Sequence, residues 1–153
     1  MEDVTIADSE LHEALFRSFI RPMVVADRNG RIVEWNHAAE QCIGLSREWA
    51  VGRQLWEVQA AVAPAAIPYE RACETARDTF FRLVRQSDSE HHPWRVRSHG
   101  SILSAQGVVR QIRSEIFPVW IRHNLVIVST LSDPSGDWFA AGEPDGWVAP
   151  TAS

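Results

Sequence analysis

The sequence predicts an α+β fold, in which a five-stranded antiparallel sheet carries helices on one face and an N-terminal helix precedes the first strand. An apolar run at 23–26 ends in the turn sequence Asp-Arg-Asn-Gly at 27–30, and a second strand-like run follows at 31–35. A long amphipathic stretch at 69–85 then precedes three further strand-like runs. Short hairpin connections favour antiparallel pairing, so the predicted order of elements is β-β-α-α-α-β-β-β.

This pattern divides the chain into three segments. A folded domain is predicted at 22–133, with a helical extension at 1–21 and an irregular tail at 134–153. The tail is too short to form a domain, so we expect a disordered end, with docking onto the sheet as the alternative. Docking is considered because the tail holds three large aromatic residues, Trp138, Phe139 and Trp147.

The N-terminal extension is predicted to contain one amphipathic helix. Asp8 or Ser9 can cap it, and Pro22 ends it because the residue before a proline avoids helical geometry. Its apolar residues recur every four positions: Leu11, Leu15 and Phe19. Such a narrow stripe either packs on the domain or pairs with the same helix of a second chain, and the pattern favours neither arrangement.

The first half of the domain shows clear turn and cap signals. Asn-Gly at 29–30 is typical of a tight hairpin in which both residues adopt positive φ. Asn36 is predicted to cap the next helix, because its side-chain oxygen can accept a hydrogen bond from the first helical turn. Ser46 is predicted to cap a further helical turn that Gly52 ends, and residues 60–68 form a connector.

The second half is predicted to contain the longest helix and three strands. Residues 69–85 place apolar side chains on one face and charged ones on the other, and 86–93 form a polar loop. A bulge is expected near Pro118, where the alternation of apolar residues breaks. The strand-like runs are 94–103, 108–120 and 125–131, with a turn at 122–124 between the last two.

Composition excludes several function classes. The chain has 153 residues, enough for one domain with a real core, and its net charge of −5 argues against nucleic-acid binding. All its positive residues are arginine, which excludes Schiff-base chemistry. No apolar run approaches the roughly 18 residues that span a bilayer. Because the N-terminus also lacks the basic start of a signal peptide, a cytoplasmic location is expected, with reduced thiols at Cys42 and Cys73.

The first half of the chain resembles the PAS domain family, the small sensory modules of bacterial signalling proteins. The resemblance is close over 19–58 and architectural from there to 133. The matching pieces occur in the family's order: the hairpin at 27–30, Ile32-Val33-Glu34-Trp35-Asn36, Ala38-Ala39-Glu40, Gly44-Leu45-Ser46 and Gly52-Arg53. The resemblance implies a sensory and interaction module, not an enzyme, in which a ligand shifts the balance between two packings of helix and sheet.

The resemblance also implies a pocket between the long helix and the inner face of the sheet. An apolar or aromatic small molecule is the expected ligand, because the predicted lining is mostly apolar. The alternative is that these side chains simply fill the core. The predicted lining is Tyr69, Cys73, Ala76 and Phe80 on one side and Ile112 and Ile116 on the other, with Trp56 and Trp94 at the mouth and Arg97 as a further polar residue.

The cofactor cannot be named from the sequence. Haem is not expected, since family members that bind it usually supply an axial histidine from the long helix and 69–85 contain none, although a tyrosine such as Tyr69 can ligate iron. The Asn-Cys-Arg-Phe-Leu-Gln motif of covalent flavin binders is absent, and Cys42 lies on a different helix. Non-covalent flavin stays open, with three tryptophans as candidate neighbours of the ring: Trp56, Trp94 and Trp120.

Metal binding and catalysis are not predicted. His91 and His92 are adjacent and would need a third ligand such as His99 to chelate one ion. The contrasting hypothesis is a small cone-shaped α+β isomerase or hydrolase that uses a buried carboxylate and a histidine. Its candidate residues are Asp27, His37 and Glu115, and no Gly-x-Ser-x-Gly nucleophile motif is present.

The expected partners follow from this interpretation. We expect a homodimer, a small-molecule ligand and a signalling partner protein, and neither nucleic acid nor membrane. A dimerisation domain without a ligand is the third hypothesis. The identity of the signal, the downstream effector and the quaternary arrangement do not follow from the sequence.

Overall fold

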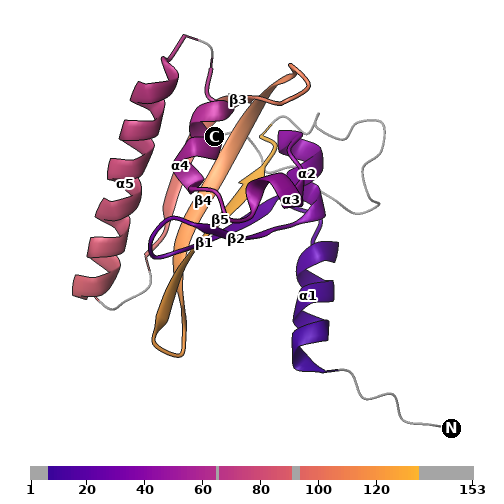
Figure 1. The fold of residues 1–153 in the computed structure, drawn as a ribbon, viewed down its shortest axis with the longest axis vertical. Helices are drawn as coiled ribbons and strands as arrows, with labels where there is room; N and C mark the ends of the chain where they lie inside the picture. The colour runs from indigo at the N-terminus through magenta and orange to yellow at the C-terminus, as the bar shows by residue number, and fades with distance from the viewer. Residues whose placement is uncertain (1–6, 65, 91–93, 135–153) are drawn as a thin grey trace, which may run out of the picture.

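A single antiparallel sheet forms the centre of the domain, as predicted (Figure 1). The structure is a computed structural model that describes residues 7–64, 66–90 and 94–134; the tail aromatics and His91 and His92 lie outside these ranges. The strands are β1 (Met23–Asp27), β2 (Ile32–Trp35), β3 (Val96–Leu103), β4 (Val109–Ile121) and β5 (Asn124–Ser132). Their spatial order is β2-β1-β5-β4-β3, so the first strand pairs with the last in the middle of the sheet.

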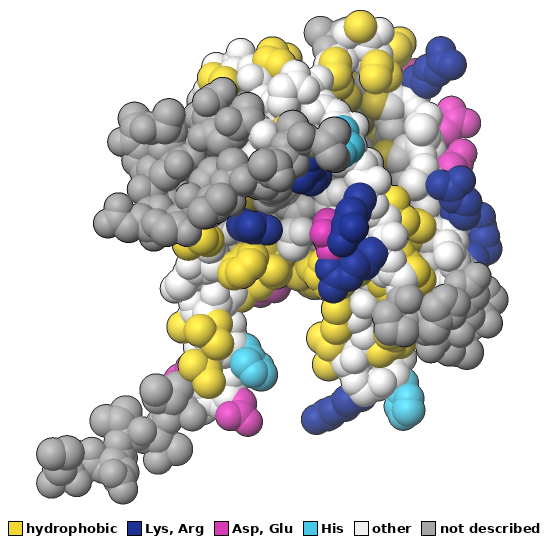
Figure 2. Space-filling model, turned by 180° about the vertical axis from the view of Figure 1, so that it is seen from behind, with side chains coloured by type: hydrophobic (Ala, Val, Ile, Leu, Met, Phe, Trp, Pro, Cys, Tyr) yellow, Lys and Arg dark blue, Asp and Glu magenta, His cyan; other side chains and the backbone are white. Residues whose placement is uncertain are grey.

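Helices α2 to α5 cover one face of the sheet, and α1 extends away from the domain (Figures 1 and 2). The helices are α1 (Asp8–Ser18), α2 (His37–Ile43), α3 (Arg47–Ala50), α4 (Leu55–Ala61) and α5 (Tyr69–Glu90). Helix α4 was not predicted, so four helices and not three lie between β2 and β3 among the described residues, and α4 packs against α5. The main contact of α1 is with α2.

The β1–β2 turn is built around Asp27. Its Oδ1 accepts hydrogen bonds from the N–H groups of Asn29 (2.9 Å) and Arg31 (3.0 Å), while its carbonyl accepts from Gly30 (2.9 Å). Gly30 has a φ of +84°, whereas Asn29, which tolerates a positive φ, does not adopt one. The Asp27 carboxylate stabilises a wider three-residue turn, so only one residue needs the left-handed conformation.

The predicted N-caps Asn36 and Ser46 are confirmed, but the cap predicted at Asp8 or Ser9 is wrong, because α1 already begins at Asp8 and Ala7 precedes it without a side-chain cap. Asn36 Oδ1 accepts from the N–H of Ala39 (2.9 Å) at the start of α2 and also from the N–H of Met23 (2.9 Å). Its Nδ2 donates to the carbonyl of Arg21 (2.8 Å), which gives this fully buried side chain partners for all its polar atoms. Ser46 Oγ accepts from a backbone N–H one turn into α3.

Helix α5 is longer than predicted. Residues 86–90, which were expected in a loop, belong to the helix, and Ser87 is buried there. Its hydroxyl donates to the carbonyl of Leu83 (2.9 Å) and accepts from Trp94 Nε1 (2.8 Å). This pair of hydrogen bonds satisfies a buried polar group and joins the end of α5 to the start of the sheet's second half.

Strand β4 carries no bulge at Pro118, contrary to the prediction. Its register with β5 is continuous, and Pro118 pairs with Ile127. The last β4 residue that pairs with β3 is Ile116. Pro118 therefore lies where β4 has a neighbour on one side only, and its missing N–H leaves the ladder intact.

The hydrophobic core lies between the sheet and the helices. Its largest fully buried side chain is Trp35, whose indole N–H donates to the carbonyl of Leu45 (3.0 Å). Residues from β1, β5, α2, α4 and α5 complete the cluster, among them Val24, Ala26, Ile43, Leu55, Val58, Phe80, Leu83 and Ile127. Helices α2 to α5 therefore face the inner side of the sheet.

Candidate ligand-binding site

Two hollows, called here the inner hollows, lie between the helices and the sheet. The first has a volume of about 130 Å³ and lies under α2 and α4; its lining includes Val24, Trp35, Ile43, Leu55, Val58, Gln59, Ile102, Ile112, Ser114, Ile116, Ser129 and Leu131. The second has a volume of about 210 Å³ and lies under α4 and α5; its lining is Leu55, Gln59, Ala76, Thr79, Phe80, Leu83, Ile116, Ile127 and Ser129.

The strand register places these side chains on one face. Along β4, Ile112, Ser114 and Ile116 alternate with outward-facing residues, and Ile116 pairs directly with Ser129 of β5. Ser114 also donates to or accepts from Ser98 of β3, with 2.5 Å between the two hydroxyl oxygens. Each hollow therefore has an apolar floor with isolated hydroxyl groups.

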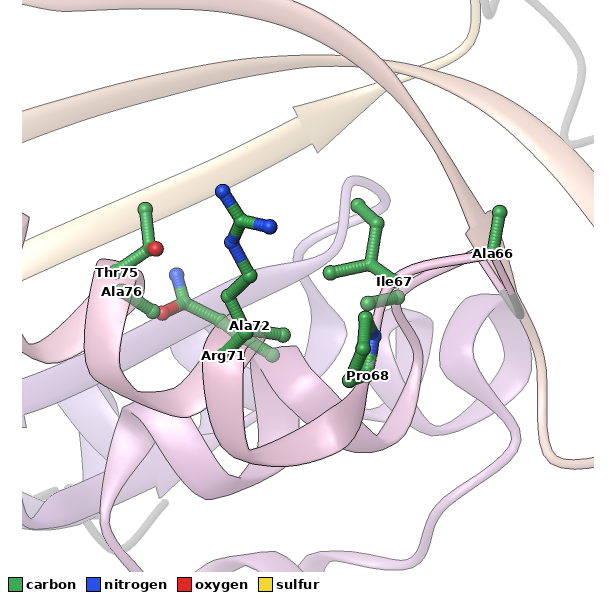
Figure 3. A pocket seen from close by; sticks show the side chains of 9 residues that line it. Ala66, Ile67, Pro68, Arg71, Ala72, Thr75 and Ala76 are labelled. Atoms are coloured by element: carbon green, nitrogen blue, oxygen red, sulfur yellow. The ribbon is translucent and has the colours of Figure 1, made fainter.

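A third hollow, called here the outer groove, opens at the surface beside the first turns of α5 (Figure 3). Its volume is about 520 Å³, and its lining is Gln59, Ala63, Ala66, Ile67, Pro68, Arg71, Ala72, Thr75 and Ala76. Gln59 of α4 lines all three hollows, and Ala76 of α5 lines both the outer groove and the second inner hollow. The three hollows are therefore neighbours.

The linings of the three hollows have a similar chemical composition. Apolar side chains form most of the lining, and the polar groups are few: the Gln59 amide, the hydroxyls of Thr75, Thr79, Ser114 and Ser129, and Arg71 at the surface. Pockets of this composition bury apolar ligands and orient them through a small number of polar contacts.

A sequence model of the PAS fold matches residues 10–115. The chain belongs to the PAS family. It is therefore a PAS sensory domain, and domains of this family are typically sensory, non-enzymatic modules. The resemblance seen in the first half of the sequence is thus confirmed over most of the chain.

Solved PAS domains share the fold. The PAS domain of Bordetella pertussis BvgS is 16% identical, with 82% of this chain and 85% of that chain covered and a TM-score of 0.59. The PAS domain of the Cronobacter turicensis RpfR quorum-sensing receptor, in complex with BDSF, is 15% identical, with 76% and 95% covered and a TM-score of 0.51. An uncharacterized protein of Azorhizobium caulinodans is 30% identical over 119 residues. That match covers 71% of this chain and only 15% of the relative's length.

The PAS domain brings four of the predicted site residues to the hollows. Ile112 and Ile116 line the inner hollows from β4, and Ala76 and Phe80 line the second from α5. These four share the two periodicities that the sequence made visible, alternation along a strand and a four-residue spacing along a helix.

Three other predicted residues lie outside the hollows, on the α4 side of α5. Trp56 packs against Phe80 and Phe81, with ring centroids 5.9 and 5.4 Å away. Cys73 Sγ donates to the carbonyl of Trp56 (3.7 Å), so this thiol links the two helices. Tyr69 is 52% exposed, and its hydrogen bond with the Cys73 thiol raises the pKa of its phenol.

The remaining two predicted residues are placed elsewhere. Trp94 is buried and donates to Ser87, so it supports the end of α5. Arg97 does not reach the hollows, because it lies on the opposite face of the sheet and pairs with Glu115 (3.4 Å). Arg95 also donates a hydrogen bond to Glu115, and this bond is the main reason why the pKa of the Glu115 carboxyl is lowered.

Sequence reasoning missed Gln59, Ser114 and Ser129. A weak signal for Gln59 was present in the sequence. It is a polar residue directly after Val58, in a run whose apolar residues follow a helical spacing, so it lies near the apolar face of a helix. The two serines gave no signal of their own, because only the β4–β5 register shows that they face inward together.

The candidate residues of the enzyme hypothesis do not meet. Asp27 holds the hairpin turn, His37 lies 3.4 Å from Glu40 on α2, and Glu115 pairs with arginines on the outer face of the sheet. Burial raises the pKa of the Cys42 thiol to about 12, which keeps it protonated and unreactive at neutral pH.

The residues that the structure describes offer neither a cluster of metal ligands nor a membrane-spanning helix. Within them, no group of three or more histidine, cysteine, aspartate or glutamate side chains could hold a metal ion. The helices of those segments are also too short or too polar for any of them to cross a membrane.

Proposed function

We propose that this PAS domain senses a small, mostly apolar molecule that binds in the inner hollows. The observation that carries the proposal is the position of these hollows, between the inner face of β4 and β5 and the packed pair α4 and α5. The RpfR PAS domain, which has the same fold, is in complex with BDSF, and this supports a ligand-binding role for the fold.

The signal would arise from a change in helix packing. A ligand between α4, α5 and the sheet contacts Gln59, Ala76 and Ile116, which belong to three different elements. If two packings of these elements exist, a ligand that fits one of them better shifts the population toward it. The partner protein that reads this change and a cytoplasmic location remain proposals.

Filling the second inner hollow tests the ligand site. Ala76→Phe adds a ring beside Phe80 and Ile116, and we expect it to prevent a small molecule from co-purifying with the protein. Native mass spectrometry of the purified chain measures the bound mass directly. Ser129→Leu fills the same hollow from β5 and serves as an independent second variant.

The matched control is Ala61→Phe, which makes the same chemical change on an exposed residue of α4 that lines none of the three hollows. Circular dichroism establishes that each variant is folded. A bound molecule that persists in both folded, filled variants would place the ligand elsewhere. A chain that carries no molecule and takes up none from a metabolite extract would contradict ligand sensing.

A second candidate function is dimerisation through α1. Four large apolar side chains of α1 and the residues that follow it are exposed: Leu11 (43%), Leu15 (61%), Phe19 (41%) and Ile20 (46%). Figure 2 shows hydrophobic side chains along α1 where it projects from the domain. A second copy of the chain would cover this stripe, and the domain could then signal through the dimer with or without a ligand.

Flavin remains a proposal without a site of its own. The three tryptophans considered for it lie apart: Trp56 packs on α5, Trp94 supports the end of α5, and Trp120 lines a separate hollow with Arg28 and His123. Visible absorption of the purified protein tests flavin and haem together, since either would colour the sample.

A further inference from the structure

The outer groove carries a charge that the inner hollows lack. Among the described residues that line the three hollows, Arg71 is the one with a charged side chain. Figure 3 shows this side chain rising from α5 between Thr75 and Ile67, over the apolar surface that Pro68 and Ala72 provide. A guanidinium thus lies at the surface, in a groove that is otherwise mostly apolar.

Arg71 forms no hydrogen bond or ion pair with any part of the chain that the structure describes, and its neighbours Glu70 and Glu74 are exposed and outside the lining. Other arginines of the domain are paired with carboxylates: Arg28 with Asp88, Arg47 with Glu34, and Arg95 and Arg97 with Glu115. Arg71 therefore keeps its planar set of N–H donors available, and carboxylate is the group that such a fork binds best.

A charged groove next to an apolar hollow would favour one orientation of a bound ligand. The outer groove adjoins the second inner hollow at Gln59 and Ala76, and that hollow is lined by Phe80, Ile116 and other mostly apolar residues. An apolar chain that ends in a carboxylate matches this arrangement, because its tail would be buried while its charge stays at the surface next to a cation.

We infer that the ligand is an elongated apolar carboxylate and that Arg71 is the residue that recognises its head group. This inference rests on the proposed function, since it names the ligand class for the same site. A neutral molecule of equal length would fill the same hollows but would gain nothing from Arg71.

Calorimetric titration of the whole chain with decanoate and with decan-1-ol tests the inference, because the two probes differ only in the head group. We expect decanoate to bind more tightly than decanol. Arg71→Gln should weaken decanoate binding about 3- to 10-fold, the range for a partly solvated ion pair, and leave decanol binding unchanged. Added salt should reduce the preference for decanoate in the wild-type chain. Arg82→Gln, an exposed arginine of α5 outside the lining, is the matched control and should bind both probes as the wild type does.

Three results would overturn the inference: equal binding of the two probes, unchanged decanoate binding by Arg71→Gln, or no binding of either probe. The proposed function fails separately. Suppose that native mass spectrometry finds a neutral molecule that is lost in Ala76→Phe. The ligand site would then be supported, and the inference that the ligand is a carboxylate would be contradicted. If Arg71→Gln weakens decanoate binding but Ala76→Phe and Ser129→Leu leave it intact, the head group is recognised while the tail does not enter the inner hollows.

Discussion

The side chain of Asn36 connects the N-terminal extension to the core. It bonds the backbone of Arg21, which precedes the sheet, and of Met23, which begins β1, while it caps α2 at Ala39. All of these hydrogen bonds involve a buried amide, so losing one would leave a polar group without a partner. The direction in which α1 leaves the domain is thus set from inside the core.

Gly30 provides a prediction at the same scale. A Cβ at this position would lie 2.2 Å from Trp56 Cζ3, and the residue also has a φ of +84°. We therefore expect Gly30→Ala to destabilise the domain by about 1–3 kcal/mol, the sum of left-handed strain and displacement of the indole ring. Urea denaturation measures this loss.

Gly52→Ala separates the two causes. Gly52 has a similar φ of +93°, but nothing lies within 4 Å of its added Cβ. Gly52→Ala should therefore be destabilised only by backbone strain, which costs about 1 kcal/mol. Equal losses in the two variants would show that the Trp56 contact contributes nothing.

At the scale of single elements, α1 is the helix with the least support from the domain. None of its described residues is buried, and its apolar stripe faces solvent. If a second copy covers the stripe, Leu15→Glu should shift the chain from dimer to monomer, because it places a carboxylate at the most exposed apolar position. Sedimentation velocity measures the molecular mass in solution.

The control for α1 is Arg17→Glu, which changes the charge of the same helix on the side away from Leu15. It should leave the dimer in place, although it removes the ion pair between Arg17 and Glu13 (2.9 Å). A wild-type chain that sediments as a monomer at micromolar concentration would contradict dimerisation through α1.

The pairing of β3 with β4 contributes a pH-dependent part of the stability. Hydrogen bonds from Arg95 and Arg97 lower the pKa of Glu115 below its usual 4.5. A lowered folded-state pKa stabilises the fold above the unfolded-state value, and that stability is lost as the pH falls through the folded-state value. Glu115→Gln should therefore cost about 0.5–1 kcal/mol at pH 7. This cost should shrink as the pH falls below 4.5 and vanish once the pH is below the folded-state pKa.

Thermal unfolding at several pH values measures this difference. Glu13→Gln removes a carboxylate whose ion pair is more than half exposed on both sides, so it should show almost no pH-dependent effect. A Glu115→Gln variant that is as stable as the wild type at pH 7 would show that the arginines act only on the surface charge and not on the fold.

At the scale of the whole molecule, the two faces of the sheet differ in their chemistry. Its inner face holds the hollows, and its outer face carries the arginine–glutamate pairs of β3 and β4. The ion pair between Arg28 of the hairpin turn and Asp88 of α5 (2.6 Å) joins the ends of the two layers. A change in the position of α5 would therefore alter the Arg28–Asp88 ion pair at the hairpin as well as the shape of the second inner hollow.

Local signals in the sequence were sufficient for most of the fold. The turn at 27–30, the caps Asn36 and Ser46, and the amphipathic α5 depend on neighbouring residues, and each formed where it was expected. The end of α5 was missed because Ser87 is stabilised by Trp94, a contact that closes only after the chain has turned back. The absence of a bulge at Pro118 likewise could not be predicted, because it depends on the β3–β4 pairing, which reaches only to Ile116 of β4.

The sequence by itself determined the class of fold and the family, because turns, caps and periodic apolar faces are short-range properties of the chain. It also identified Ala76, Phe80, Ile112 and Ile116 as residues of inward faces. Only the tertiary structure decided that Arg97 faces away from the hollows and that Gln59 and Arg71 border them. Strand register and the packing of α4 on α5 set these positions, and both arise between residues that are distant along the chain.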